Sequence, residues 1–373
     1  MNEISSRSSW DADREREFLK IAADMHIANP KSAHVIGENG QEFQLRVNES
    51  EIEAIGILKG ALRFQAESVL DLPVAGDWVI VSQLTESEFL IHKVLPRRSL
   101  LVRKIKGEHQ KPDPICANMD QIFILQGLDG DFQPRRLERT LVQIWESQAT
   151  PVIILTKKDL YLSREEELAE KIQLVNQACP GVKVFCISNE NMDGIEDLKE
   201  YWNNGSTSAF IGSSGVGKSS LLNHLLGDKL RTVNEVRVSD SKGKHTTTNR
   251  WMFRLESGGW ILDTPGMREV QLWSDGNGLE ETFPEIYEAA HDCKFQDCTH
   301  QAEPECGVKK AIELGKISQE RWLSFFKLKK EIERSESIAT PKAKIANAEK
   351  AKWKIIHKEQ KRFQQQRNRE RYK

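Results

Sequence analysis

A glycine-rich stretch at residues 212–219 limits the possible folds of this chain more strongly than any other part of its sequence. It reads Gly212, Ser213, Ser214, Gly215, Val216, Gly217, Lys218 and Ser219, followed by Ser220. The stretch matches G-x-x-x-x-G-K-[ST], follows an apolar strand-like run and precedes a helix-like one. Glycines let backbone N–H groups close around a phosphate, and the helix start adds its positive dipole end. We therefore predict a strand, a phosphate-binding loop and a helix.

Strand-like and helix-like segments alternate on both sides of this stretch, from about Met119 onward. The apolar runs DQIFILQGL, TPVIILTKKD, VKVFCIS, SAFIGSSG and GWILDTPG each lead into a polar or glycine-rich loop. This alternation is typical of a mostly parallel α/β sheet, whose ligands gather at the carboxyl ends of the strands. We predict such a domain over residues 112–282.

Three segments supply the groups that a nucleoside triphosphate with Mg²⁺ requires. Lys218 would span the β- and γ-phosphates, and Ser219 would ligate Mg²⁺. In the strand-end sequence DTPG, Asp263 would hold the Mg²⁺ shell and the amide of Gly266 would sense the γ-phosphate. The third segment, GKHTTT at residues 243–248, has the polar character of a switch loop. Spacing does not identify its switch threonine, and we favour Thr247.

A fourth motif identifies the base. Thr156, Lys157, Lys158 and Asp159 follow the strand PVIIL and match the [NT]-K-x-D pattern. An Asp carboxylate accepts two hydrogen bonds from the N1–H and the exocyclic amine of guanine, a donor pattern that adenine lacks. Ser188, after the strand VKVFC, could supply a backbone amide to the guanine oxygen. The sequence therefore predicts GTP and GDP as ligands.

The order of these motifs is unusual. The guanine motif at residue 156 precedes the phosphate loop at residue 212, although ordinary GTPases have the reverse order. The cyclic order is unchanged, and a circular permutation produces this arrangement because chain termini tend to lie near one another at the surface. We predict a circularly permuted P-loop GTPase domain.

The residue that positions the attacking water does not follow from the nucleotide-binding motifs. Met267, directly after DTPG, stands where Ras-like enzymes place the Gln that orients the attacking water. A methionine cannot position water by hydrogen bonding, so we expect slow intrinsic turnover. His245 in the switch loop is the candidate for that role, and a loop histidine without a role is the open alternative.

A Cys/His cluster follows near the end of the globular sequence. Cys293, Cys298, His300 and Cys306 offer three thiolates and one imidazole, which favour tetrahedral Zn²⁺ with no open position. We expect one structural zinc per chain, with His291 as a rival ligand. Three further cysteines lie apart from the cluster and have no predicted role: Cys116, Cys179 and Cys186.

The part of the chain before residue 112 has a different character. Residues 33–111 contain short apolar runs broken by Gly, Asn and Pro, which indicate a small β-barrel. Residues 1–32 are polar and indicate an extension or an added helix, to which we assign no chemistry. The segment 97–111 is basic, and either a solvated loop or an edge that grips nucleic acid would explain it.

Charge and hydropathy limit the expected binding partners and the expected cellular location of the protein. The chain has 54 Lys and Arg against 56 Asp and Glu, yet residues 342–373 carry twelve Lys or Arg and only three Glu. This basic tail, within the predicted segment 336–373, suggests a polyanionic partner, with a solvated helix as the alternative. No apolar run approaches the roughly 18 residues of a membrane span, so we expect a cytoplasmic monomer without membrane contact.

These features together closely resemble the RsgA (YjeQ) family of circularly permuted GTPases. The resemblance covers about residues 33–335 and includes GDWVIV, KVLPRRSLLVRK, the nucleotide motifs and CKFQDCTHQAEPEC. It implies a multidomain protein with an N-terminal OB-type β-barrel, a permuted α/β GTPase domain and an α-helical zinc-binding domain over residues 283–335.

The resemblance also implies function. Family members bind the small ribosomal subunit and its rRNA and hydrolyse GTP, stimulated by the subunit, during its late maturation. The family pattern selects His300 over His291, while the N-terminal extension and the long basic tail depart from it. The alternative is a nucleotide-gated rRNA-binding adaptor in which hydrolysis is incidental.

Overall fold

The described part of the protein comes from a computed structural model of the 373-residue chain. It comprises residues 10–39, 42–48, 52–104, 112–202, 205–227, 250–264 and 277–338. The chain divides into two compact units, Met1–Trp273 with Asn277–Pro284, and Ser274–Gly276 with Glu285–Lys373.

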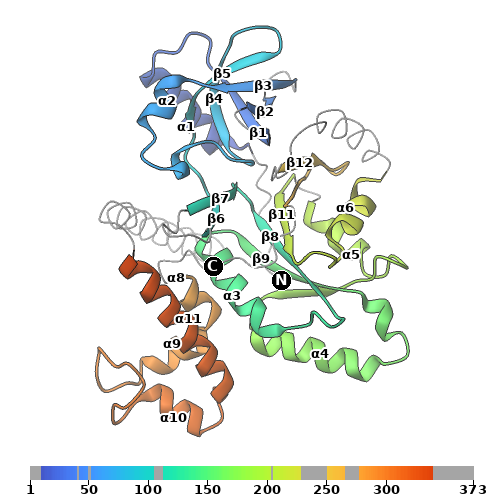
Figure 1. Ribbon diagram of the computed structural model, residues 1–373, viewed down its shortest axis with the longest axis vertical. Helices are drawn as coiled ribbons and strands as arrows, with labels where there is room; N and C mark the ends of the chain where they lie inside the picture. Colours follow the sequence, from blue (N-terminus) through green and yellow to red (C-terminus); the bar gives the residue numbers. More distant parts are fainter. Residues whose placement is uncertain are drawn as a thin grey trace, which may run out of the picture. The chain divides into compact units, whose positions relative to one another are not determined.

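The first unit begins with a closed five-stranded barrel, drawn in blue in Figure 1. Its strands are β1 (Lys31–Asn39), β2 (Glu42–Val47), β3 (Glu53–Leu58), β4 (Trp78–Gln83) and β5 (Glu88–Val94). β1 pairs with β2 and β4, β2 with β3, β3 with β5 in parallel, and β5 with β4, which closes the barrel. Alternate apolar side chains such as Leu45, Val81 and Ile91 fill its interior. The predicted OB-type barrel is confirmed.

Two helices belong to the barrel. α2 (Gly60–Gln65) is short, whereas α1 (Ala12–Asp24) is capped by the carboxylate of Asp11, which accepts a hydrogen bond from the amide of Arg14. Phe18 and Ala22 of α1 pack on Trp78 and other apolar side chains outside the barrel. The N-terminal extension therefore contains a helix that is part of the core.

The GTPase domain has a six-stranded sheet in the order β10-β9-β8-β11-β13-β12. The strands are β8 (Gln121–Gly127), β9 (Thr150–Thr156), β10 (Lys183–Cys186), β11 (Thr207–Gly212), β12 (Trp251–Arg254) and β13 (Trp260–Asp263). All pairs are parallel except β12 with β13. The strands with the guanine motif precede the strand with the phosphate loop, so the predicted permuted order is confirmed.

Helices flank this sheet, and apolar clusters on its two faces form the core. The helices are α3 (Pro134–Glu146), α4 (Glu165–Ala178), α5 (Glu196–Lys199), α6 (Lys218–Leu226) and α8 (Asn277–Thr282). The amide of Gly278 in α8 donates to the carboxylate of Glu146 at the end of α3 over 3.0 Å. This contact fixes α8 against the GTPase domain.

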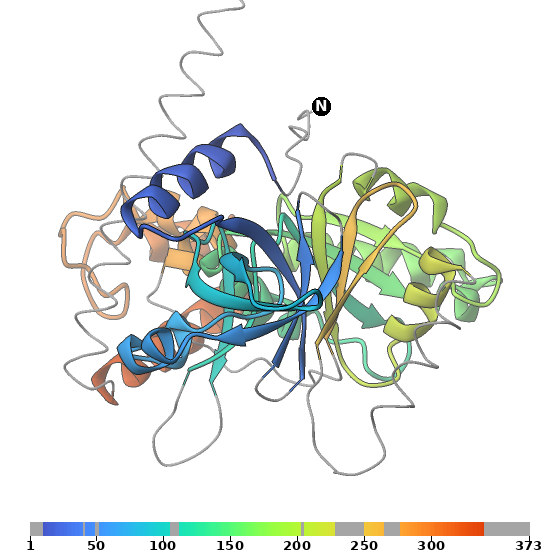
Figure 2. The same ribbon diagram turned by 90° about the horizontal axis from the view of Figure 1, so that it is seen from above.

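Two features join the barrel and the GTPase domain. The antiparallel pair β6 (Leu100–Lys104) and β7 (Pro112–Ala117) spans the predicted limit between residues 111 and 112. In addition, β12 pairs with β1 through Gly37 and Trp251, so the sheet of the GTPase domain continues into the barrel. Figure 2 shows the gold strands β12 and β13 beside the blue barrel strands.

The second unit is helical. It contains α9 (Pro284–Ala290), α10 (Gly307–Glu313) and α11 (Gln319–Ile338), with the cysteine-rich segment between α9 and α10. Val308, Phe325, Leu328 and Ile332 are buried in it. Among the described helices of the whole chain, none is long and apolar enough to cross a membrane.

Candidate functional site

The predicted nucleotide motifs meet at one edge of the GTPase sheet. Neighbouring parallel strands place their carboxyl ends side by side, and there lie Gly127, Thr156, Cys186, Gly212 and Asp263. This edge is where an open α/β sheet binds its ligand. Segments more than 100 residues apart in sequence thus form one site.

The phosphate loop connects β11 to α6 and depends on glycines at close approaches. A Cβ on Gly212 would lie 2.5 Å from the carbonyl oxygen of Leu125, and one on Gly217 would lie 2.5 Å from Nδ2 of Asn189. Gly217 also has a φ of 99° and is the N-cap of α6. Other side chains would clash or be strained at these positions. The loop therefore presents the start of α6 and its free amides toward the sheet edge.

Lys218 lies against the backbone of this loop. Its Nζ donates to the carbonyl oxygens of Gly212, at 2.6 Å, and Ser213, at 2.8 Å. Burial lowers the pKa of Lys218, and the carboxylate of Asp263 acts in the opposite direction. A partly desolvated ammonium attracts a phosphate oxygen more strongly than a solvated one does. Ser214, Ser219 and Ser220 are exposed on the same loop and helix start.

The guanine motif is bonded to the phosphate loop. The hydroxyl of Thr156, which is fully buried, donates to the carbonyl oxygen of Val216 over 2.7 Å. Lys157 follows with a φ of 65°, an uncommon backbone conformation for a lysine, and its Nζ pairs with Asp129 at 2.5 Å. The two loops thus form one rigid assembly around the sheet edge.

Asp159 is oriented by the neighbouring strand end. The hydroxyl of Ser188 donates to Oδ1 of Asp159 over 2.6 Å and accepts from the amide of Glu190 over 3.1 Å. The amide of Lys158 donates to the carbonyl oxygen of Ile187 over 3.0 Å. Because Ser188 is completely buried, this contact holds one carboxylate oxygen in a fixed direction. Asp159 is thereby positioned to accept hydrogen bonds from a planar base.

The DTPG sequence lies partly in the described chain. Asp263 ends β13, and the buried hydroxyl of Thr264 donates to the carbonyl oxygen of Phe210 in β11. Lys158, at the other end of the site, pairs with Asp193 at 2.7 Å, and this hydrogen bond raises the pKa of its ammonium. His245, Thr247, Gly266 and Met267 lie outside the described residues, so their predicted roles remain predictions.

Sequence reasoning missed three residues that support the site. Asp131 accepts hydrogen bonds from the hydroxyl of Ser213 and from Arg136, and these bonds lower the pKa of its carboxyl. Asp129 pairs with Lys157, and Asn189 donates to the carbonyl oxygen of Gly217 over 3.2 Å. Each follows the carboxyl end of a parallel strand, and that position is the signal that could have identified them.

The cysteine-rich segment brings four ligand atoms together. Atoms of Cys293, Cys298, His300 and Cys306 all lie within 4.8 Å of one another, whereas His291 is not a member of this group. The Sγ atoms of Cys293 and Cys306 are 3.9 Å apart, and Nδ1 of His300 lies 3.4 Å and 3.5 Å from them. A tetrahedral Zn²⁺ site has sulfur–sulfur edges of about 3.8 Å and sulfur–nitrogen edges of about 3.6 Å, given its usual bond lengths. The four residues therefore fit a zinc ion.

The surroundings favour the ligand forms of Cys293 and His300, whereas burial raises the pKa of the Cys298 thiol to about 11. Burial acts against ionisation of Cys293, but hydrogen bonds, chiefly from the amides of Val308 and Gly307, outweigh it and lower the pKa of its thiol. The Gly307 amide donates to its Sγ over 3.3 Å. Burial, together with the charge of Lys329, lowers the pKa of His300 and keeps its imidazole neutral. Metals bind thiolates and neutral imidazoles, so both shifts favour coordination.

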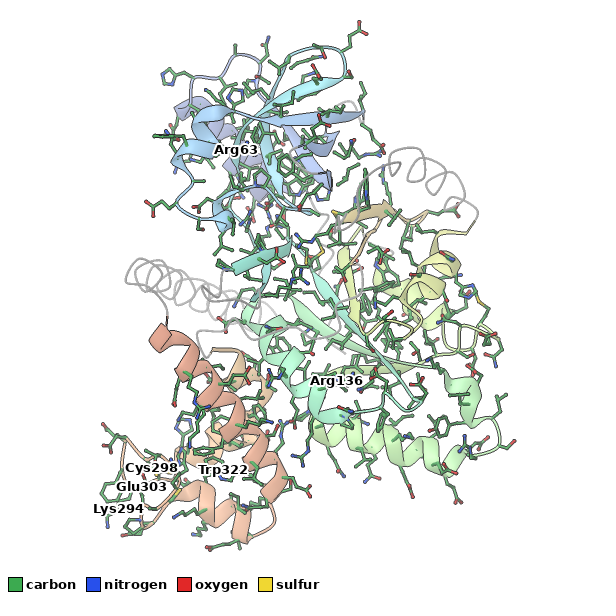
Figure 3. All side chains as sticks on the ribbon, viewed as in Figure 1. Arg63, Arg136, Lys294, Cys298, Glu303 and Trp322 are labelled. Atoms are coloured by element: carbon green, nitrogen blue, oxygen red, sulfur yellow. The ribbon has the colours of Figure 1, made fainter. Side chains whose placement is uncertain are left out.

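A carboxylate shapes the loop that carries His300. Glu303 accepts hydrogen bonds from the amides of Thr299, Gln301 and Ala302, at 2.9–3.0 Å. Figure 3 labels Glu303, Cys298 and Trp322 in this unit. The ring of His300 packs edge to face on the ring of Trp322, with 5.9 Å between the ring centroids. The backbone of His300 has a φ of 61°. The loop thus turns the imidazole toward the sulfurs.

Comparison with known proteins identifies relatives over most of the chain. The RsgA GTPase family model matches residues 94–273. The chain is 38% identical over 343 residues to the small ribosomal subunit biogenesis GTPase RsgA of Leptospira interrogans, with 91% of each chain covered. It is 39% identical over 310 residues to RsgA 1 of Oceanobacillus iheyensis, covering 82% of this chain and 86% of that protein.

Solved structures share the fold. YjeQ from Thermotoga maritima superposes with a TM-score of 0.60 at 26% identity, covering 81% of this chain and 98% of YjeQ. YloQ, described as a circularly permuted GTPase, also gives a TM-score of 0.60, at 25% identity, covering 83% of this chain and 97% of YloQ.

Proposed function

The chain belongs to the RsgA GTPase family, and on this premise we propose that it binds the small ribosomal subunit and hydrolyses GTP to GDP and phosphate during subunit maturation. Relatives named as small ribosomal subunit biogenesis GTPases match more than four fifths of its length. The single observation that carries the nucleotide assignment is the fixed carboxylate of Asp159, bonded to Ser188 within a loop that Thr156 ties to the phosphate loop.

The proposed base contact follows from this geometry. Asp159 accepts the N1–H and the exocyclic amine of guanine. The backbone amide of Ser188 donates to the carbonyl oxygen of Asp193 over 3.0 Å, so we assign it no contact with the guanine oxygen. ATP is rejected because adenine lacks the paired N1–H and amine donors of guanine. Binding of adenine would therefore leave the carboxylate of Asp159 unpaired. Lys218 and the amides of residues 212–219 bind the phosphates.

Two metals complete the proposal. Ser219 and Asp263 hold Mg²⁺, which neutralises charge on the phosphates when it is bound. Cys293, Cys298, His300 and Cys306 hold one structural Zn²⁺, consistent with their mutual distances. With four protein ligands, the zinc site has no open position for catalysis, so its role is to hold the loop between α9 and α10.

The proposed cycle uses the switch sequences. Thr247 and Gly266 respond to the γ-phosphate, and His245 positions the attacking water when the subunit is bound. We expect GTP to favour the subunit-bound state and GDP to favour release. Equal subunit affinity with GDP and with a non-hydrolysable GTP analogue would contradict this cycle.

The remaining parts are proposed to serve binding. The barrel (residues 33–111) and the basic tail (336–373) contact rRNA. Between them lie the proposed GTPase domain, residues 112–282, and the proposed zinc-binding domain, residues 283–335. We propose a cytoplasmic monomer. Deletion of residues 342–373 should weaken subunit binding and reduce its salt dependence, because fewer counterions are released.

The decisive experiment measures GTP turnover with and without purified small subunits, with ATP as the control nucleotide. We expect slow turnover alone and strong stimulation by the subunit. The second candidate, a nucleotide-gated rRNA-binding adaptor, predicts nucleotide-dependent subunit binding without stimulated turnover, so the same experiment separates the two.

A further inference from the structure

Strand β12 lies between the nucleotide site and the barrel. On one side, Trp251 is the register partner of Asp263, the proposed Mg²⁺ ligand at the end of β13. On the other side, the same residue is the register partner of Gly37 in barrel strand β1. A single strand therefore separates the proposed metal ligand from the barrel wall (Figure 2).

The contact between β12 and β1 is close. A Cβ on Gly37 would lie 2.8 Å from Cε3 of the Trp251 ring, a distance that real side chains do not adopt. The amide of Glu38 also donates to the carbonyl oxygen of Arg250 over 3.4 Å. Packed interfaces of this kind move as a unit or rearrange, because they deform little.

Arg250 reinforces the contact with charge. Its side chain is 10% exposed, and its NH1 donates to the carbonyl oxygen of Pro114 over 2.6 Å. NH2 lies 3.2 Å from Oδ1 of Asp113, and NH1 lies 3.8 Å from Oε2 of Glu38. The guanidinium thus contacts β7 and barrel strand β1 at once, from the start of β12.

Glu38 is itself fixed within the barrel. Its Oε1 accepts a hydrogen bond from the amide of Ala75 over 2.9 Å. Burial raises the pKa of its carboxyl, while Arg250 opposes that effect. A partly buried ion network resists stretching, because a partner that moves away leaves a poorly compensated charge. A displacement of β12 must therefore shift β1 or break this network.

The position of Arg250 in the chain places the ion network of Arg250, Glu38 and Asp113 next to the predicted switch segment. It directly precedes β12 and lies three residues after Thr247, the proposed switch threonine. Nucleotide-dependent rearrangement of switch segments is the usual response of GTPases to the γ-phosphate. The start of β12 is therefore adjacent to two groups proposed to sense the nucleotide: Thr247 in sequence and Asp263, the register partner of Trp251, in the sheet.

We propose that Arg250, with Glu38 and Asp113, transmits the nucleotide state of the GTPase domain to the barrel and so sets the affinity of the barrel for its polyanionic partner. The effect on subunit binding rests on the proposed function. Arg250 is a positioning residue here, because no contact with the nucleotide is assigned to it.

Four variants test the proposal. Arg250→Gln and Glu38→Gln remove the two sides of the network, and Arg250→Lys keeps the charge without the forked geometry. Arg16→Gln is the matched control, because it removes an arginine that pairs with Asp13 on α1, outside the network and outside residues 33–111. Thermal unfolding confirms that each variant is folded, and Glu38→Gln replaces Arg250→Gln if the latter is not.

The first readout is the ratio of small-subunit affinities with a non-hydrolysable GTP analogue and with GDP. For the wild type we expect a ratio of about 5 to 150, the usual range of allosteric coupling. Arg250→Gln and Glu38→Gln should bring it within about 2-fold of unity without a matching loss of nucleotide affinity. Arg250→Lys should fall between, and Arg16→Gln should match the wild type.

The second readout is independent of the ribosome. Hydrogen exchange of peptides from β1 and β2 should differ between GDP and the GTP analogue in the wild type, and this difference should vanish in Arg250→Gln. If the wild-type subunit ratio is unity but exchange depends on nucleotide through Arg250, the proposed function fails and the coupling stands. If hydrogen exchange of the β1 and β2 peptides is the same with GDP and with the GTP analogue, the proposed coupling is wrong. It is also wrong if Arg250→Gln leaves both readouts unchanged.

Discussion

The hydroxyl of Thr156 donates to the carbonyl oxygen of Val216, so the guanine loop and the phosphate loop are bonded across 60 residues of sequence. Thr156→Val removes the donor and leaves a buried carbonyl unpaired, at a cost of about 1–3 kcal/mol. We expect weaker GTP binding and a lower unfolding temperature, measured by nucleotide titration and thermal unfolding. Thr156→Ser keeps the hydroxyl and is the control; equal losses in both variants would exclude the hydrogen bond as the cause.

The base specificity of Asp159 can be inverted. Asp159→Asn should weaken GTP binding by about 100-fold or more, because an amide cannot accept both guanine hydrogen bonds. The new N–H can instead donate to the 2-oxo group of xanthine, so affinity for XTP should rise. Competition binding with GTP and XTP measures both effects. Asp193→Asn, which alters only the partner of Lys158, should leave the preference for GTP intact.

The cysteine cluster should carry stoichiometric zinc. Cys306→Ser should lower the zinc content from about one ion per chain to near zero, because it removes a buried thiolate ligand. Elemental analysis measures the metal, and circular dichroism should show loss of helix from residues 285–338. Cys179→Ser changes a buried cysteine outside the cluster. If that variant lost zinc equally, the four-residue assignment would be wrong.

His34 should make the barrel sensitive to acid. It is 2% exposed, stacked on Trp78 at 4.5 Å, and burial with the charges of Arg14 and Arg46 lowers its pKa to about 3. The unfolded chain binds this proton below about pH 6.5, so stability falls as the pH drops from there toward 3. At pH 5 the loss is about 2 kcal/mol.

Chemical denaturation at pH 7 and pH 5 checks this prediction. His34→Phe retains a stacked ring without a titrating group, so its stability should change less between the two pH values. An equal change in both proteins would show that other groups cause the acid sensitivity.

His245 is the proposed residue for positioning water. His245→Ala should bind GTP normally yet lose about 100-fold of subunit-stimulated turnover, the scale of a general base or positioning group. Single-turnover hydrolysis with saturating subunits measures the effect. His26→Ala, at an exposed position after α1, is the control. Unchanged stimulated turnover in His245→Ala would remove this residue from the mechanism.

Local patterns predicted the architecture well. The string from Gly212 to Ser219 indicated the strand, loop and helix because each glycine there answers a local steric requirement. The spacing of Cys293 and Cys306 indicated a metal cluster because few other arrangements explain clustered thiols. Chain order alone indicated the permutation, and the strand order of the sheet agrees with it.

Contacts between distant segments were not predictable in the same way. Ser188 was expected to offer only its backbone amide, and its hydroxyl contact with Asp159 depends on how β9 and β10 pair. The contact of Asp131 with Ser213 similarly depends on the register of β8 with β11. The sequence left open whether residues 1–32 add a helix, because the apolar face of α1 has meaning only once Trp78 lies against it. A single sequence does not show which strands pair or which distant side chains come into contact.

The continuation of the sheet from β12 into β1 bears on the solubility of the enzyme. The edge strand of an open sheet exposes unpaired amides and carbonyls that recruit other chains, and proteins commonly cover such edges. Here Glu38 and Gly37 of the barrel provide the cover for Arg250 and Trp251. A GTPase domain cut free at residue 112 would expose this edge together with an indole ring. The barrel thus covers a sheet edge of the kind that favours self-association when it is exposed.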